Sequence, residues 1–459
     1  MKKYLILLLI VLLAASMSFI GISCKKAETT AAAETTAAAE TTAAATKIAS
    51  EEEWLASLKG KYVGKELNLV TTAFCSAADI DAAFLELTGA KVNALTSGWE
   101  DFVQKSRTLL ATKASEGMDA YLIDASFLGE YGLNGWYAPV QDMIFESDKN
   151  DVIQSFLDMY TYSNGDLIGV PFNASSYLLF YNPEMLAKGG YDSPPKTIDE
   201  LRSMSMDLIK QGICKYGTSM ELTAGDMAMD NWTVILVSMG GQLWNKDFTA
   251  PTFNEGGYGL KALNYIVDGM YTDKWINPSS INWSREEANQ PFLKGEEPFK
   301  LQWQFQWPLV KDPAGSAVSK IAKFATVPMN EGAVTNSSIA GGAFGANPYS
   351  QNVELAKDYC RYFAAKVNMM LSFEKRGTLP MWKSLYSDPK AVAIEPDMPI
   401  ILEGLRLSSM FMSVANWKTE ANEIFYGELA SAFNKEISSE EALSNIEAKI
   451  NQRFEENWK

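Results

Sequence analysis

Residues 165–201 read GDLIGVPFNASSYLLFYNPEMLAKGGYDSPPKTIDEL, and this stretch decides the fold. Two apolar runs, 167–172 and 177–181, are separated only by the polar residues 173–176, which predicts two neighbouring strands. Thr197, with a glutamate three residues later, has the pattern of a helix N-cap and capping box. Strands followed by a helix in this way indicate an α/β fold.

The chain before this stretch alternates between strand and helix patterns. In order, the expected elements are a strand at 67–70, a helix capped by Asp79 and ending at Gly89, a strand at 91–95, a helix at 100–114 and a strand at 120–123. Such alternation predicts a parallel sheet with right-handed crossovers. Ligands of open α/β sheets bind beyond the carboxyl ends of the strands. This rule brings together Thr72, Phe74, Asp124 and Phe127 near a crevice. Further helices are expected at 231–239, 258–270 and 440–454.

The N-terminal segment is typical of an export signal followed by a tether. A basic start precedes an apolar run at 5–15, and Cys24 follows small residues. The segment resembles a bacterial lipoprotein signal, in which residues 1–23 are removed and Cys24 is lipidated, although Gly21 replaces the usual leucine. A retained transmembrane anchor is the alternative. Residues 24–47 contain ETTAAA three times and are expected to form a low-complexity tether.

Composition and charge exclude several classes of function. The chain has 459 residues, 47% of them hydrophobic, so it can bury a large core. Its 40 basic and 56 acidic residues give a net charge of −16, which argues against nucleic-acid binding. Without residues 1–23 the count is 38 basic and 56 acidic, a net charge of −18. The chain has no histidine, which excludes imidazole catalysis and histidine-bound metals.

The cysteines give little evidence of a disulfide framework. Cys75, Cys214 and Cys360 remain if Cys24 is lipidated, and they are widely spaced. At most one disulfide could form, and buried free thiols are the favoured state.

Ordered landmarks along residues 62–452 resemble those of the solute-binding proteins of bacterial sugar ABC transporters, extracellular solute-binding protein family 1, which is similar to maltose-binding protein. The landmarks are GDLIGVPF at 165–172, LFYNPEML at 179–186, PPKTIDEL at 194–201, SMGGQL at 238–243, FLKGE at 292–296, Gly341-Gly342, GTLP at 377–380 and SEEAL at 439–443.

The resemblance implies a two-lobe periplasmic-binding-protein fold of class II, α/β, with lobes joined by crossing hinge strands. We expect lobe 1 at residues 48–174 plus 339–384, and lobe 2 at 175–338 plus 385–459. The ligand lies between lobes that close on it by hinge motion. The complex then docks on the permease subunits of an ABC importer. Such a protein is a monomer outside the cytoplasm, held to the membrane only by its lipid anchor, and it is not an enzyme and needs no cofactor or metal.

Sugar chemistry and the resemblance together suggest ligand-binding positions. Aromatic rings stack on the C–H faces of sugars, and carboxylates or amides bind their hydroxyls. Residues 301–307, LQWQFQW, interpreted as a strand, place Trp303, Phe305 and Trp307 on one side, with a buried core strand as the alternative. Asp124 aligns near a sugar-binding carboxylate of the family, with a helix N-cap as the alternative.

The family's remaining contact regions add further candidates. Ser175 lies where the family has an acidic residue, so Asn173 or Ser176 would bind in its place. Glycines 341 and 342 permit close backbone approach at a crossover or at the ligand. Each candidate side chain could instead serve only in packing. The complete set is Phe74, Asp124, Phe127, Asn173, Ser175, Asp230, Asn231, Trp232, Trp303, Phe305, Trp307, Gly342 and Trp417.

Two other functions stay open at the level of sequence. A polyamine site needs several carboxylates and aromatic rings, which this chain has. A surface glycoside hydrolase needs two paired carboxylates, and no motif singles out such a pair. The 12 tryptophans favour an oligosaccharide, since each sugar ring can use its own stacking platform.

Overall fold

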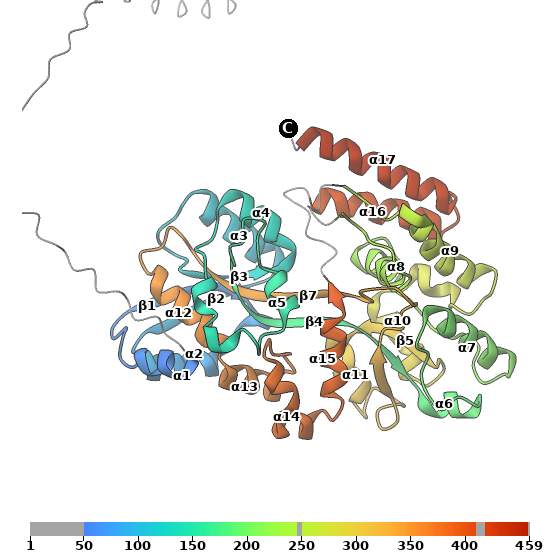
Figure 1. Cartoon of the computed structure of the whole chain (residues 1–459), viewed down its shortest axis with the longest axis horizontal. Coiled ribbons are helices and arrows are strands. Elements are labelled where there is room, and N and C mark those ends of the chain that lie inside the picture. The colour runs from blue at the N-terminus through green and yellow to red at the C-terminus, as the bar shows by residue number, and fades with distance from the viewer. Residues whose placement is uncertain (1–49, 246–249, 410–417, 458–459) are drawn as a thin grey trace, which may run out of the picture. The chain divides into compact units, whose positions relative to one another are not determined.

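The computed structural model describes residues 50–245, 250–409 and 418–457 (Figure 1). The expected signal peptide, the lipidation site Cys24, the tether and the candidate Trp417 lie outside the described residues. Within the described ranges, no helix combines the length and the apolar character that crossing a membrane requires.

The described strands form a mixed sheet in the order β2-β1-β3-β7-β4-β5, with β6 paired to β4 and β8 to β7. Their bounds are β1 Glu66–Thr72, β2 Lys91–Ser97, β3 Ala120–Asp124, β4 Val170–Tyr181, β5 Phe299–Trp303, β6 Lys323–Thr326, β7 Ser337–Ala346 and β8 Ser408–Ser409. β1 pairs in parallel with β2 and β3, which confirms the parallel arrangement predicted from the sequence. β7 runs antiparallel to β3 and to β4.

The long strands β4 and β7 cross between the two lobes (Figure 1). We refer to the part that contains β1, β2 and β3 as the first lobe, and to the part that contains β5 and β6 as the second. β4 pairs with β7 in its first half and with β5 and β6 in its second half. β7 pairs with β3 at its end. The expectation of a two-lobe α/β fold with crossing hinge strands is confirmed.

The polar break predicted at 173–176 does not exist, and β4 is a single strand. The prediction of two strands was wrong because residues 173–176 pair with Gly342–Ile339 of β7. The register shifts between Pro171 and Asn173, where the proline has no N–H to donate. Pairing with a strand so distant in the chain cannot be read from local polarity.

The strand predicted for 301–307 is shorter in the structure. β5 ends at Trp303, and after a 3-10 turn the helix α11 (Trp307–Lys311) begins with Pro308 in its first turn. A proline fits the first turn of a helix but cannot donate within a sheet. Trp303 and Phe305 still stack, with ring centroids 6.1 Å apart, whereas Trp307 lies in the helix. The prediction that Trp307 shares one side of a strand with Trp303 and Phe305 was therefore wrong.

Helices pack around the sheet in each lobe (Figure 1). They are α1 Glu51–Ser57, α2 Ala78–Thr88, α3 Trp99–Ala111, α4 Leu128–Asn134, α5 Gln154–Asp158, α6 Pro183–Lys188, α7 Ile198–Lys210, α8 Asp226–Ser238, α9 Tyr258–Tyr271, α10 Arg285–Leu293, α11 Trp307–Lys311, α12 Val353–Phe363, α13 Lys366–Arg376, α14 Pro389–Ile394, α15 Met398–Arg406, α16 Lys418–Phe433 and α17 Ser439–Asn457. The helices expected near 100–114, 231–239, 258–270 and 440–454 are therefore confirmed, with shifted ends.

Two clusters of buried side chains meet at β4. Leu178 and Phe180 belong to the cluster that fills the first lobe and continues along one side of β4. Tyr177 and Leu179 belong to the cluster formed with α8, α9, α16 and α17. Successive side chains of a strand point to opposite faces, so one strand supplies both cores.

Local sequence signals agree with the structure in most places. Thr197 caps α7, because its hydroxyl accepts from the backbone N–H of Glu200 at 3.0 Å. Gly89 ends α2 in the left-handed conformation, with φ of 80°. The prediction that Asp79 caps a helix was wrong, because α2 already begins at Ala78. The Asp79 carboxylate pairs with Lys375 at 2.9 Å.

The described cysteines are free thiols, in line with the expectation from their spacing. Cys360 is buried, and burial raises the pKa of Cys75 to about 11 and that of Cys214 to about 12. Thiols with such raised pKa values are poor nucleophiles at neutral pH.

Candidate functional site

A cavity of about 530 Å³ is lined by residues of both lobes and of β7. Its volume is that of a small-molecule binding site. The first lobe supplies Trp99, Asp124, Ala125, Ser126 and Phe127, the crossing strand β7 supplies Ser338, Ile339 and Ala340, and the second lobe supplies Met227, Asp230, Arg285, Trp303, Phe305, Asn422, Glu423 and Tyr426.

Asp124 reaches the cavity because it ends β3, as the strand-end rule predicts. One oxygen of its carboxylate accepts from the backbone N–H of Ser126 at 2.9 Å and caps the 3-10 turn that carries Phe127. Gly342 of β7 pairs with Asp124 in the sheet register. Asp124 therefore caps a turn and also lines the cavity, and its contact with a ligand stays a prediction.

Two stacked aromatic rings form the first-lobe wall. Trp99 begins α3 just after the carboxyl end of β2, and its side chain is 43% exposed. Its ring stacks on Phe127, with centroids 6.0 Å apart and planes 20° apart. Phe127 in turn stacks on Tyr131 at 5.8 Å, and the Arg107 guanidinium lies 5.2 Å from its ring. Packing from behind thus fixes the wall while Trp99 stays open to solvent.

A second stacked pair forms the opposite wall. Trp303 ends β5, and Phe305 follows in the 3-10 turn, where its backbone N–H donates to the Ser175 hydroxyl at 3.3 Å. The two rings lie 23° from parallel, and Phe305 is 44% exposed. The Arg285 guanidinium lies 5.4 Å from the Phe305 ring centroid. A flat apolar surface with a cation at its edge results.

Charged groups around the cavity are mostly acidic. Asp124, Asp230 and Glu423 supply carboxylates, and Arg285 supplies a guanidinium whose one terminal N–H donates to the sulfur of Met227 at 2.8 Å. Carboxylates accept from hydroxyls or amines, and a guanidinium donates to oxygens. The arrangement can therefore bind a ligand that carries both donors and acceptors.

Tyr177 of β4 packs beneath Trp303, with ring centroids 4.6 Å apart. Burial, and then the nearby carboxylates of Asp230 and Glu221, raise the pKa of Tyr177 well above its usual range. The phenol is therefore protonated at any physiological pH. The described residues contain no group of three or more carboxylates and thiols arranged to hold a metal ion.

The structure brings five of the sequence-predicted residues to the cavity and leaves others elsewhere. Those at the cavity are Asp124, Phe127, Asp230, Trp303 and Phe305. Ser175 is buried beside Phe305 and Asn173 is half-buried in β4. Phe74, 77% exposed, and Gly342, on the crossing strand, are absent from its lining.

Three further candidates lie in buried surroundings. Trp232 is fully buried against Phe253 and Phe425, 5.6 and 5.9 Å between centroids, because it faces the second-lobe core from α8. Trp307 donates from its indole N–H to Glu395 at 2.8 Å in the other core. Asn231 is buried next to Asp230 and bonds to Glu221. None of the three lines the cavity.

Sequence reasoning missed several lining residues. Trp99 follows the end of β2 just as Asp124 ends β3, so the strand-end rule could have found it. Arg285, which opens α10, has no local signal for a cavity, since only the packing of α10 beside β5 brings it there. Asn422, Glu423 and Tyr426 follow a stretch with no motif and come from α16.

The glycine pair of β7 is required by the crossing. A side-chain carbon at Gly341 would clash with the carbonyl oxygen of Asn173 on β4, and one at Gly342 would lie 3.0 Å from the Phe172 ring. The prediction of close backbone approach is therefore confirmed at the crossover.

Comparisons with known proteins agree with this geometry. Residues 79–400 match the family model of the bacterial extracellular solute-binding proteins. A binding protein of Brucella abortus is 24% identical over 230 residues, which cover 50% of this chain and 54% of that protein. A Deinococcus radiodurans protein named "Probable ABC transporter-binding protein" is 23% identical over 299 residues, which cover 62% and 67% of the two chains. The chain thus spans about half the length of the first curated relatives it matches.

A solved structure shows the same fold. Maltose-bound MalE3 of T. maritima is 20% identical, covers 84% of this chain with 99% of its own, and superimposes with a TM-score of 0.69.

Proposed function

Because this chain belongs to the family of bacterial extracellular solute-binding proteins, we propose that it captures a carbohydrate between its lobes and delivers it to the permease of an ABC importer. The observation that carries the proposal is the pair of stacked aromatic walls, Trp99 with Phe127 and Trp303 with Phe305, which line one cavity from opposite lobes. Such walls suit the apolar faces of sugar rings. The family comprises binding proteins that act outside the cytoplasm and are not enzymes.

The polar groups of the cavity support the same ligand class. Asp124, Asp230 and Glu423 can accept from hydroxyl groups, and Arg285 can donate to hydroxyl oxygens. A sugar hydroxyl both donates and accepts, so it matches either kind of group. Aromatic walls on both lobes favour an oligosaccharide, since each wall can hold a different ring.

Isothermal titration calorimetry with a panel of monosaccharides, oligosaccharides and sugar alcohols tests the proposal. We expect saturable binding of at least one of them. Tryptophan fluorescence should change on binding, because Trp99 and Trp303 line the cavity. Failure of every carbohydrate to bind, together with tight binding of a polyamine, would overturn the carbohydrate assignment.

A polyamine is the second candidate, favoured by one observation. Among the described residues, three carboxylates but a single arginine line the cavity, so their net charge attracts a cationic ligand. Titration with putrescine and spermidine beside the sugars separates the two. Polyamine affinity should fall steeply with salt, whereas affinity for a neutral sugar should not.

We further propose that Cys24 carries a lipid and that residues 24–47 tether the folded part to the membrane. Labelling with a radioactive fatty acid tests the anchor, and Cys24→Ser should abolish the label and release the protein. The proposed lobes, 48–174 plus 339–384 and 175–338 plus 385–459, are supported by the crossing of β4 and β7. The expected monomer is tested by light scattering on a sizing column.

A further inference from the structure

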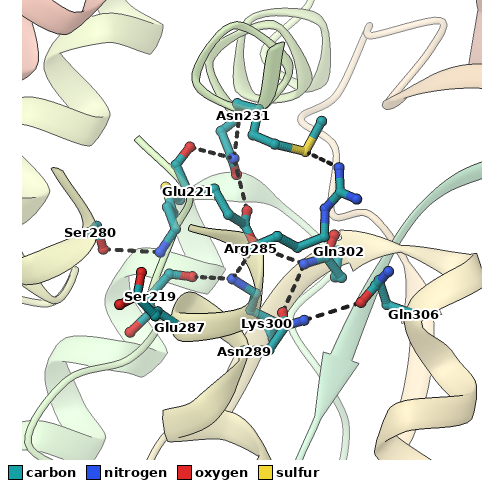
Figure 2. Close-up of polar contacts among 12 residues, drawn as sticks. Ser219, Glu221, Asn231, Ser280, Arg285, Glu287, Asn289, Lys300, Gln302 and Gln306 are labelled. Carbon is teal, nitrogen blue, oxygen red and sulfur yellow. Dashed lines mark hydrogen bonds and ion pairs between the residues drawn. The ribbon is translucent and has the colours of Figure 1, made fainter. Parts of the chain in front are cut away.

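A chain of polar side chains, most of them buried, lies next to Trp303 in the second lobe, and Figure 2 shows its members. We refer to it as the buried polar network. It consists of Glu221, Asn231, Asn289, Lys300, Gln302 and Gln306. Glu221, Lys300 and Gln302 are each 1% exposed, so this network is closed to solvent at its centre.

Glu221 is the centre of the network. Its Oε1 accepts from the Lys300 ammonium at 3.0 Å and from the Gln302 amide at 2.8 Å, and its Oε2 accepts from the Asn231 amide at 3.2 Å. Lys300 also donates to the carbonyl oxygen of Ser219 at 2.9 Å. A buried ion pair of this kind is weak evidence for stability, because desolvation offsets its attraction. Such a pair can instead serve to fix the conformation of the residues bonded to it.

The branches of the network end beside the residues that line the cavity. Gln302 precedes Trp303, and its Oε1 accepts from the Trp303 backbone N–H at 2.9 Å. The Gln302 amide also donates to Asn289 at 2.8 Å, and Asn289 lies one helical turn after Arg285 on α10. The Asn289 amide then donates to the side-chain oxygen of Gln306 at 3.3 Å, and Gln306 directly follows Phe305 in the chain.

A further branch reaches α8. The Asn231 amide donates to the Met227 carbonyl oxygen at 2.8 Å, and Met227 and Asp230 both line the cavity. One carboxylate therefore connects the lining residues of α8, α10, β5 and the turn after β5.

We propose that Glu221 and Lys300 are positioning residues that set the relative placement of Arg285, Trp303 and Phe305, and thereby the ligand selectivity of the cavity. The selectivity part rests on the proposed function. The physical reason is that the Glu221 carboxylate accepts from three donors in fixed directions. A glutamine in its place offers one acceptor oxygen and turns an N–H₂ group toward other donors.

The test uses two variants of the full chain. Lys300→Met alone would leave Glu221 buried without its cation, so the first variant combines Glu221→Gln with Lys300→Met and keeps the volume with neither charge. The second, Gln302→Met, cuts the branch to Trp303 and leaves the ion pair intact. If the first variant does not fold, Glu221→Gln alone takes its place, because Gln302→Met tests only the branch that leads to Trp303.

The first measurement needs no ligand. The protein is labelled with 5-fluorotryptophan, and the ¹⁹F resonance of Trp303 is assigned with Trp303→Phe. We expect both variants to shift or broaden the Trp303 resonance and to leave those of Trp54 and Trp382 in the first lobe unchanged. An unmoved Trp303 resonance in a folded variant overturns the positioning role.

Arg361→Met is the matched control, since Arg361 is another fully buried cation, located in the first lobe. Its guanidinium lies 5.4 Å from the Trp54 ring and 4.9 Å from the Trp382 ring. This control should lower the melting temperature, move the resonances of Trp54 and Trp382, and leave Trp303 in place. A shift of the Trp303 resonance in the control as well would contradict the proposal, because any loss of stability would then disturb the cavity.

The second measurement is the ratio of the dissociation constants of two carbohydrates that wild type binds, determined well below the melting temperature. We expect the ratio to change by about tenfold in the network variants, which is the effect of about one misplaced hydrogen-bonding group. The ratio should not change in Arg361→Met. An unchanged ratio overturns the selectivity role. If wild type binds no carbohydrate, the proposed function fails, and the ¹⁹F measurement still decides the positioning role.

Discussion

The two lobes bury a cation in different ways. Arg361 of α12 pairs with Glu51 at 2.5 Å and with Asp148 at 3.0 Å. Two of its guanidinium nitrogens have no hydrogen-bond partner among the described residues. Instead, three aromatic rings lie 4.9–5.4 Å from the guanidinium carbon, those of Trp54, Phe145 and Trp382. The first lobe thus holds its buried cation by two carboxylates and by three aromatic rings.

The Lys300 ammonium of the second lobe donates to oxygen atoms of Glu221 and Ser219. The difference follows from the chemistry of the two cations. A planar, weakly hydrated guanidinium can rest on aromatic faces, whereas a compact ammonium needs acceptors in definite directions. A packed cation therefore adds cohesion, and a directionally bonded cation also fixes orientation. Of Arg361 and Lys300, only Lys300 lies beside the cavity, near Gln302 and Trp303 in β5.

The largest effect that the comparison predicts is on stability. Arg361→Met leaves Asp148 and Glu51 without their cation, and breaking a buried pair in this way costs about 3–5 kcal/mol. Urea unfolding of the variant against wild type measures the free energy of unfolding. Carbohydrate affinity should stay at its wild-type value. A loss below about 1 kcal/mol would mean that water reaches the two carboxylates in spite of the three aromatic rings around Arg361.

The stability of the protein should depend on pH through Glu297, a buried carboxylate of the second lobe. Burial raises the pKa of Glu297 to about 7, above an ordinary value of 4.5, while the Ser219 hydroxyl and Lys300 oppose the rise. Because the folded protein binds this proton more tightly than the unfolded chain, the stabilisation is complete below pH 4.5 and is lost as the pH rises through 7. The loss amounts to roughly 3 kcal/mol over that window.

Urea unfolding at several pH values measures this slope, and Glu297→Gln is the control. Glutamine keeps the shape and cannot titrate, so the variant should lose this part of the pH dependence. An equal slope in the variant and in wild type would assign the dependence to other groups.

The sequence predicted the individual elements well because their signals are local, whereas the two-lobe arrangement was expected from the resemblance to a family. The cap at Thr197, the stop at Gly89 and the parallel order of β1, β2 and β3 need no knowledge of distant residues. The break at 173–176 was wrong because a partner more than 160 residues away, β7, completes the strand. Pairing of distant strands overrides local polarity.

The strand-end rule predicted part of the first-lobe side of the candidate site. Asp124 and Phe127 were found by that rule, and Trp99 was within its reach. Arg285 depends on how α10 packs, which no spacing reveals. Lys300 and Gln302 alternate with Leu301 in β5, a pattern of a strand with one wet face, yet all three are buried. Their burial is a property of the assembled lobe.

The two aromatic walls should contribute unequally to binding. Trp99→Ala removes an exposed ring and should weaken carbohydrate binding by about tenfold, about 1.4 kcal/mol. Phe305→Ala should cost more, because Phe305 also supports the Arg285 guanidinium. Calorimetry with the same sugar compares the two, and Leu133→Ala, an exposed residue outside the cavity lining, is the control. Equal losses would show that the support of Arg285 does not contribute.

The smallest effect is expected from an exposed cation beside a buried carboxylate. Lys61 pairs with Asp358 at 2.7 Å, which is closer than Lys300 to Glu221, but its side chain is 43% exposed. Lys61→Met should cost less than about 1 kcal/mol, because water solvates the lysine in either state. Asp358 keeps its bonds from the Trp54 indole at 3.0 Å and the Tyr62 hydroxyl at 2.6 Å, so it is not left unsatisfied. Urea unfolding beside Arg361→Met gives the comparison directly. A cost close to that of Arg361→Met would mean that distance, and not burial, determines the energy of these pairs.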